Sequence, residues 1–131
     1  MDDHVAALRG VPLFAGLDEH SLQAVAVLAQ SVNAKAGDVL ILEGEPGDSF
    51  YVIIDGTVRV EHGDRTVRSM TAGGFLGEIA LVEHGPRTAT ATCVTECRLL
   101  ELRRHEFERL MVTMPEVAGR VQAAIERRAR E

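Results

Sequence analysis

The sequence predicts a mainly β fold, an antiparallel β-barrel or jelly roll with helices at both ends of the chain. Turn-forming residues recur about every 8–12 residues between positions 31 and 102, as in antiparallel sandwiches and barrels. Runs rich in β-branched and aromatic residues lie between these turns. Apolar residues at helical spacing precede and follow this region. We therefore expect one domain, residues 1–131, made of N-terminal helices (1–30), a barrel (31–102) and C-terminal helices (103–131).

The first 30 residues carry helix signals. Asp18 is a typical N-cap, because its carboxylate can accept a hydrogen bond from a first-turn backbone N–H. Pro12 and Gly16 interrupt the segment, which predicts two short helices rather than one. Apolar residues follow Asp18 at helical spacing: Leu22, Val25, Ala26 and Ala29.

The central region contains several predicted strands, at residues 38–42, 49–54, 57–60 and 88–94. Asp55-Gly56 separates two of these runs and is the strongest short hairpin signal in the chain. A further turn is expected at His84-Gly85-Pro86. The closed arrangement that we expect is a cupin-like double-stranded β-helix.

From about Arg103 the helical period returns. Pro115 favours a new helix, because proline suits the first helical turn. Two apolar stripes at helical spacing flank it, which predicts two C-terminal helices: Phe107, Leu110, Met111 and Met114, then Val117, Val121, Ala124 and Ile125.

Composition excludes several classes of protein. Fourteen basic residues against twenty acidic ones give a net charge of −6, which argues against a nucleic-acid binder that works by bulk charge and against an anionic membrane surface. No apolar segment is long enough to span a bilayer. The acidic opening leads into no apolar segment, so we expect no secretory signal and a cytoplasmic protein.

No catalytic or metal centre is visible. The histidines are scattered, without the paired spacing and carboxylates of a metal site, and no nucleophile stands beside a histidine and an acid. We therefore expect no enzyme, no metal and no cofactor. Cys93 and Cys97 are expected to be buried, reduced thiols. The 29 residues after Leu102 are filled by the two predicted helices, so we expect no DNA-reading helix in this chain.

Residues 74–90 do not follow the regular alternation of strands and turns. Glycines run into a helix-compatible stretch that begins near Glu78, so unpaired backbone N–H groups converge at a helix N-terminus, which favours an anion. Arg87 follows Glu78 by nine residues, before a Thr/Ala strand. A glycine turn, a carboxylate and an arginine at this spacing indicate a site for an anionic ligand.

Residues 75–81 (FLGEIAL) and 86–90 (PRTAT) resemble, in order and spacing, the phosphate-binding cassette of cyclic nucleotide-binding domains. This family includes protein kinase A regulatory subunits, cyclic nucleotide-gated channels and bacterial catabolite activators. Residues 44–53 (GEPGDSFYVI) and 11–14 (VPLF) extend the resemblance over nearly the whole chain.

The resemblance implies roles that fit the chemistry of the residues. Arg87 would hold the cyclic phosphate in a bidentate fork, and Glu78 would accept from the ribose 2′-OH. Asp48 would hold Arg87 in place. The rest of the expected ligand-binding set comprises Gly77, Ile79, Ala80, Thr88, Ala89 and Arg68.

The identity of the nucleotide stays open between cAMP and cGMP. Thr88 can hydrogen-bond the amine of a syn guanine, and Arg68 lies where cGMP-dependent kinases place an arginine toward the guanine edge. Bacterial members often carry Ser or Thr at the position of Thr88 and respond to cAMP, so we favour cAMP. Arg68 can equally be a solvated strand residue.

The resemblance also implies that the last helix closes over the base as a lid. Candidate lid residues are Ile125, Arg127 and Arg128, although the same stripe also fits ordinary helix packing with a basic, solvated end. The expected function is a sensor that passes the position of its C-terminal helices to an effector protein or a fused domain. The alternative is a degenerate domain, with Glu78 and Arg87 as a structural ion pair, that serves as a protein-interaction module.

Overall fold

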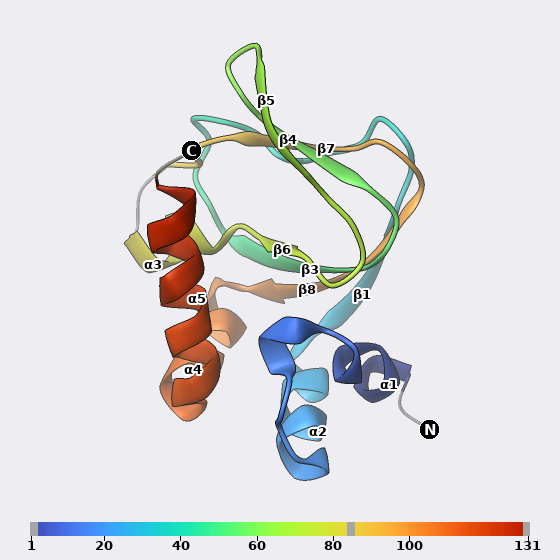
Figure 1. Cartoon of the computed structure of the whole chain (residues 1–131), viewed down its shortest axis with the longest axis vertical. Helices are drawn as coiled ribbons and strands as arrows, with labels where there is room; N and C mark the ends of the chain where they lie inside the picture. Colours follow the sequence, from blue (N-terminus) through green and yellow to red (C-terminus); the bar gives the residue numbers. More distant parts are fainter. Residues whose placement is uncertain (1–2, 84–85, 130–131) are drawn as a thin grey trace.

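The computed structural model describes residues 3–83 and 86–129. Over these two ranges the chain forms eight strands in two four-stranded antiparallel sheets, which face each other as a flattened barrel (Figure 1). In spatial order, the first sheet comprises β1 (Gln30–Ala34), β8 (Cys97–Arg103), β3 (Ser49–Asp55) and β6 (Phe75–Leu76). The second comprises β2 (Val39–Ile41), β7 (Thr90–Cys93), β4 (Val58–His62) and β5 (Arg65–Met70). The predicted mainly β fold is confirmed.

Helices flank the barrel at both ends of the chain, and a further short helix lies within the order of the strands. They are α1 (Asp3–Arg9), the 3-10 turn η1 (Pro12–Phe14), α2 (Glu19–Leu28), α3 (Glu78–Glu83), α4 (Arg104–Thr113) and α5 (Pro115–Arg128). The predicted cap is confirmed, because the Asp18 carboxylate accepts from the Ser21 N–H at 2.8 Å. Pro115 begins α5, as expected for a residue suited to the first turn.

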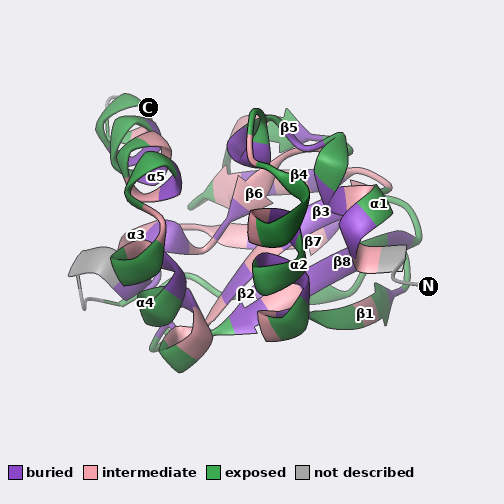
Figure 2. Cartoon of the chain, turned by 90° about the horizontal axis from the view of Figure 1, so that it is seen from below, coloured by how far each residue is buried: buried purple, intermediate pink, exposed green. Residues whose placement is uncertain are grey.

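Two apolar cores stabilise this arrangement. The outward face of the first sheet packs against the terminal helices; the Phe50 ring of β3, for example, lies 4.9 Å from that of Phe107 in α4. The second core lies between the sheets and includes Ile53 and Leu99. Leu99 and Leu100, neighbours on β8, belong to different cores because successive strand side chains point to opposite faces. Buried residues accordingly follow the strands and the inner faces of the helices (Figure 2).

The prediction of a hairpin at Asp55-Gly56 is wrong. β3 ends at Asp55 and β4 begins at Val58, but these strands belong to different sheets. The turn carries the chain across the barrel, against the connection between β7 and β8. A Cβ at Gly56, whose φ is +107°, would lie 2.6 Å from the Glu96 carbonyl oxygen, so glycine permits this close backbone approach. Of the turn predicted at His84-Gly85-Pro86, the first two residues lie outside the described residues, and Pro86 forms an isolated β-bridge with Pro46.

Cys93 and Cys97 are buried and free, as predicted. In the part of the chain that the structure describes, we find no helix with the length and apolarity needed to cross a membrane. Nor do the described residues include three clustered His, Cys, Asp or Glu side chains that could hold a metal ion.

Candidate functional site

Gly77 forms the tight junction between β6 and α3. Its φ is +100°, and a Cβ there would lie 2.5 Å from the Ser49 carbonyl oxygen and 3.0 Å from Nη1 of Arg87. Only glycine adopts this conformation and leaves this space without strain. The junction therefore allows β3, the start of α3 and Arg87 to meet at one point.

Arg87 is held in place by backbone carbonyls. Its Nη1 donates to the Gly77 oxygen at 2.9 Å and its Nη2 to the Ser49 oxygen at 2.7 Å. The side chain is buried, with 8% exposed. Burial lowers the pKa of Arg87 from its usual value, while nearby Tyr51 and Glu78 act in the opposite direction. Since a guanidinium has five N–H donors and stays charged, this arrangement presents a preoriented cation.

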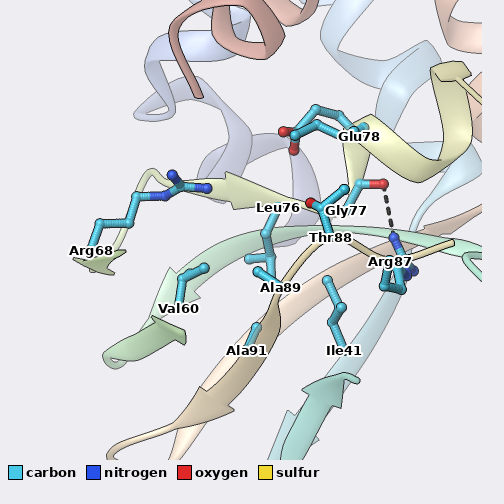
Figure 3. A pocket seen from close by; sticks show the side chains of 11 residues that line it. Ile41, Val60, Arg68, Leu76, Gly77, Glu78, Arg87, Thr88, Ala89 and Ala91 are labelled. Carbon is cyan, nitrogen blue, oxygen red and sulfur yellow. Dashed lines mark hydrogen bonds between the residues drawn. The ribbon is translucent and has the colours of Figure 1, made fainter. Parts of the chain in front are cut away.

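Arg87 lines a cavity of about 380 Å³, measured with its open mouth, which we call the inner cavity (Figure 3). Its wall joins apolar strand residues to the polar cassette: Ile41, Val60, Arg68, Leu76, Gly77, Glu78, Ile79, Arg87, Thr88, Ala89 and Ala91. An adjoining outer cavity shares several of these residues and adds His62, Val67, Ile125, Arg128 and Ala129. Ile125, Arg128 and Ala129 in this list show that the end of α5 borders the same site.

Glu78, at the start of α3, is the second buried charge, with 2% exposed. Its Oε1 lies 2.7 Å from Nη1 of Arg128 on α5, a contact of opposite charges that is not aligned as a hydrogen bond. Nη2 of Arg128 donates to the Phe75 oxygen at 2.8 Å, and its guanidinium carbon lies 4.6 Å from the centre of the Phe75 ring. Oε1 of Glu78 thus keeps the capacity to accept a hydrogen bond from a ligand.

Arg68 joins Arg87 as a cation in the wall of the inner cavity, and it also lines the outer cavity. Burial lowers its pKa to about 10; the charge of Arg128 acts in the same direction and that of Glu78 opposes it. Among the described residues that line the two cavities, three arginines, Arg68, Arg87 and Arg128, outnumber the one carboxylate, that of Glu78. The arrangement suits an anion with a hydroxyl beside it.

Comparison with known proteins identifies this arrangement. Residues 31–114 match the family model of the cyclic nucleotide-binding domain. The chain belongs to this family. It is 37% identical over 119 residues to a cyclic nucleotide-gated potassium channel of Rhizobium etli, which covers 90% of this chain and 33% of the channel. It is 29% identical over 133 residues to a CRP-like cAMP-activated global transcriptional regulator of Mycobacterium tuberculosis, covering 98% of this chain and 58% of the regulator.

A solved structure agrees in fold. The regulatory domain of Toxoplasma gondii protein kinase A, crystallised with cAMP, is similar with a TM-score of 0.79 and 26% identity, over 96% of this chain and 48% of that one. The chain therefore spans between a third and three fifths of the length of these relatives.

As a cyclic nucleotide-binding domain, the chain brings most of the expected site residues together. Gly77, Glu78, Ile79, Arg87, Thr88, Ala89 and Arg68 line the inner cavity. Of the expected lid residues, Ile125 and Arg128 line the outer cavity, whereas Arg127 is exposed and belongs to neither wall. Ala80 belongs to α3. Glu78 pairs with Arg128, so the structural ion pair between Glu78 and Arg87 is absent from the described residues.

The expected contact between Asp48 and Arg87 is also absent from the part of the chain that is described. The carbonyl of Ser49, the next residue, accepts from the guanidinium instead, and Asp48 affects Arg87 only through its charge. The Asp48 carbonyl accepts from the Arg104 N–H at 2.8 Å, which ties the β3 entry to α4. Every residue has a backbone carbonyl, so the sequence does not show that the one of Ser49 would accept from Arg87. The neighbouring carboxylate of Asp48 is visible in the sequence and was therefore predicted instead.

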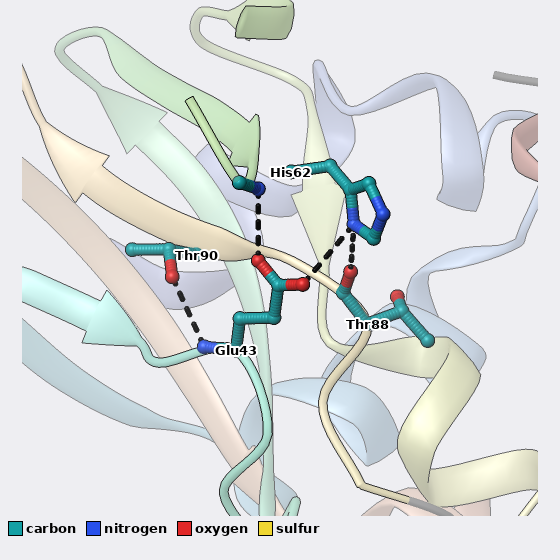
Figure 4. A network of polar contacts seen from close by, with 5 residues as sticks. Glu43, His62, Thr88 and Thr90 are labelled. Atoms are coloured by element: carbon teal, nitrogen blue, oxygen red, sulfur yellow. Dashed lines mark hydrogen bonds and ion pairs between the residues drawn. The ribbon is translucent and has the colours of Figure 1, made fainter. Parts of the chain in front are cut away.

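Sequence reasoning also missed polar residues beside the cassette. His62, at the end of β4, has its Nδ1 2.9 Å from the Thr88 oxygen and 3.3 Å from the Glu43 carboxylate (Figure 4). Arg104 of α4 donates to the Gly47 oxygen at 2.6 Å and to the Leu81 oxygen at 3.3 Å. These contacts join segments distant in the chain, so no local pattern reveals them.

Proposed function

We propose that this domain binds a cyclic nucleotide monophosphate, cAMP in preference to cGMP, and that the ligand changes the position of α4 and α5. The observation that carries the proposal is the buried Arg87, fixed by two carbonyls in the same cavity wall as the buried Glu78. Arg87 supplies the charge for the cyclic phosphate, and backbone N–H groups near Ala80, Thr88 and Ala89 complete the cradle.

Glu78 would bind the ribose of the nucleotide. An ionised carboxylate only accepts hydrogen bonds, so it suits the donor of a free ribose 2′-OH. A 2′-deoxy ligand would leave that acceptor unused, which is a basis for selection. The base would lie in the outer cavity, between the Thr88 side and the end of α5.

The preference for cAMP rests on the relatives. The Toxoplasma domain was crystallised with cAMP, and the Mycobacterium regulator is named as cAMP-activated. Thr88 and Arg68 line both cavities and favour a guanine, so cGMP is the second ligand to test.

The output would pass through α5. Arg128 links the end of this helix to Glu78 and Phe75 of the cassette, so a ligand that engages Glu78 changes the energetics of that link. Because this chain spans only part of its relatives, we propose that the signal passes to an effector protein or a fused domain.

Isothermal titration of nucleotide-stripped protein and an Arg87→Ala variant with cAMP tests the binding mode. Loss of the charged partner should weaken binding by roughly 2–5 kcal/mol, with circular dichroism unchanged. Arg65→Ala, which removes an exposed arginine of β5, is the matched control and should bind like wild type. A folded Arg87→Ala variant with wild-type affinity would overturn the proposal.

A further inference from the structure

The segment that carries Arg87, Thr88 and Ala89 precedes β7 and is held by contacts from its neighbours. The Arg87 N–H donates to the Glu45 oxygen at 2.8 Å, and the Gly44 N–H donates to the Arg87 oxygen at 2.9 Å. These two bonds fix the backbone on the Arg87 side. On the Thr88 side, the described residues supply a side-chain contact, from His62.

His62 connects two acceptors through one ring nitrogen. Its Nδ1 lies 2.9 Å from the Thr88 carbonyl oxygen and 3.3 Å from Oε2 of Glu43. Since a carbonyl and a carboxylate both accept, Nδ1 must carry the proton and donate. This assignment concerns Nδ1 alone and requires no assumption about Nε2.

Glu43 is itself held on two sides. Its Oε1 accepts from the Gly63 N–H at 3.1 Å, and its backbone N–H donates to Oγ1 of Thr90 at 3.0 Å. Glu43 thus contacts the turn after β4 through its carboxylate and the start of β7 through its backbone N–H (Figure 4). His62 and Glu43 together form a polar strap across the segment that leads from Arg87 into β7.

The strap acts on a residue that faces the ligand cavities. Thr88 lines both cavities, while its carbonyl is occupied by His62. Fixing that carbonyl limits rotation of the peptide between Thr88 and Ala89, and hence the direction of the Ala89 N–H. The strap therefore preorganises a donor of the anion cradle and the Thr88 hydroxyl beside the base.

We propose that His62, oriented by Glu43, is a positioning residue for the nucleotide site, which acts through Thr88 on affinity and on the choice of base. The inference rests on the proposed function. Because the His62 side chain is 59% exposed, its loss should leave the cores intact. One partly solvated hydrogen bond changes an equilibrium by about three- to tenfold.

The test compares His62→Ala, His62→Asn and Glu43→Gln with wild type by titration with cAMP and cGMP. The alanine variant should bind the preferred nucleotide about three- to tenfold more weakly, and the ratio of the two affinities should move toward one. Asparagine places an N–H donor near the position of Nδ1, so it should restore affinity to within about twofold of wild type. Glu43→Gln should fall between the two. His20→Ala, an exposed histidine of α2, should have no effect.

Amide NMR separates this inference from the proposed function. Without nucleotide, the Thr88 and Ala89 signals should shift in the alanine variant and return in the asparagine variant. If wild type binds no cyclic nucleotide, the proposed function fails and the inference falls with it. If wild type binds and the alanine variant has the same two affinities, or if asparagine rescues neither affinity nor shifts, the proposed function survives and the role of His62 is overturned.

Discussion

Nη1 of Arg128, in the last turn of α5, lies 2.7 Å from Oε1 of Glu78 at the start of α3. Both side chains are largely buried, and the same guanidinium donates to the Phe75 oxygen at 2.8 Å. The C-terminal helix is thereby fastened to the two elements that form the cassette wall. A ligand that competes for Glu78 acts directly on this connection.

Replacement of Arg128 tests that connection. Arg128→Gln should destabilise the domain by about 3 kcal/mol, because it leaves the buried Glu78 carboxylate without its cation. Hydrogen exchange should accelerate in the second half of α5. Arg127→Gln, which changes the exposed neighbour, is the control. Equal exchange in the two variants would show that Arg128 does not secure the helix.

Replacement of Glu78 tests whether its carboxylate recognises the ribose 2′-OH. Glu78→Gln should weaken cAMP binding about tenfold, because a charged acceptor becomes a neutral one. The preference for cAMP over 2′-deoxy-cAMP should shrink at the same time. Glu108→Gln, on the exposed face of α4, should change neither affinity. An unchanged preference in Glu78→Gln would place the 2′-OH elsewhere.

Gly77 should tolerate no side chain. Gly77→Ala adds a Cβ 2.5 Å from the Ser49 oxygen at a φ of +100°, so it should lower the free energy of unfolding by roughly 1–3 kcal/mol or more and displace Arg87. Gly37→Ala is the matched control: its φ is +93° and no atom lies within 4 Å of the added Cβ. Urea unfolding and cAMP titration measure both effects. If Gly37→Ala lost as much stability and affinity as Gly77→Ala, the positive φ alone would explain the losses, and the close approach to the Ser49 oxygen would not be needed.

Cys93 should be unreactive in the folded protein. Burial, with the neighbouring Cys97 as a further cause, raises the pKa of Cys93 to about 12 from 9.0. The thiol stays protonated at pH 8 and should react with a disulfide reagent only after unfolding. Because the folded state retains this proton longer than the unfolded state, the contribution of Cys93 to stability should fall as the pH rises from about 9 to 12. Rapid labelling of native protein at pH 8 would contradict this.

The helices were predictable because their signals are local. Asp18 caps α2 within one turn, and Pro115 begins α5, so neither depends on a distant partner. The apolar stripes also mark the buried faces, since Val117, Val121 and Ile125 all lie in the core. In this helix, the spacing of apolar residues in the sequence correctly predicts which side chains are buried.

Strand pairing was not predictable to the same extent. Asp55-Gly56 has the composition of a hairpin, but the contact that decides the turn is made with Glu96 and Cys97, some forty residues away. A local turn signal indicates that the chain reverses direction and leaves open which strand lies beside it. The sheet order of β3 and β4 therefore emerges only in three dimensions.

In the candidate site, too, the residues of a local motif were predictable and their distant partners were not. Glu78 and Arg87 stand in one short motif with unusual chemistry, and the structure places both in one cavity wall. Their partners, the Ser49 carbonyl and Arg128, come from β3 and from the end of the chain. His62 reaches Thr88 across 26 residues, without any motif to mark it.

The most direct test of the account is calorimetric titration of nucleotide-stripped wild-type protein with cAMP and cGMP, with 5′-AMP as control. Stripping is needed because a bound host nucleotide would mask the site. Micromolar or tighter binding of one cyclic nucleotide, cAMP more tightly than cGMP, with 5′-AMP silent, is the predicted result. Absence of heat and of thermal stabilisation with both cyclic nucleotides would contradict the account and favour a protein-interaction module instead.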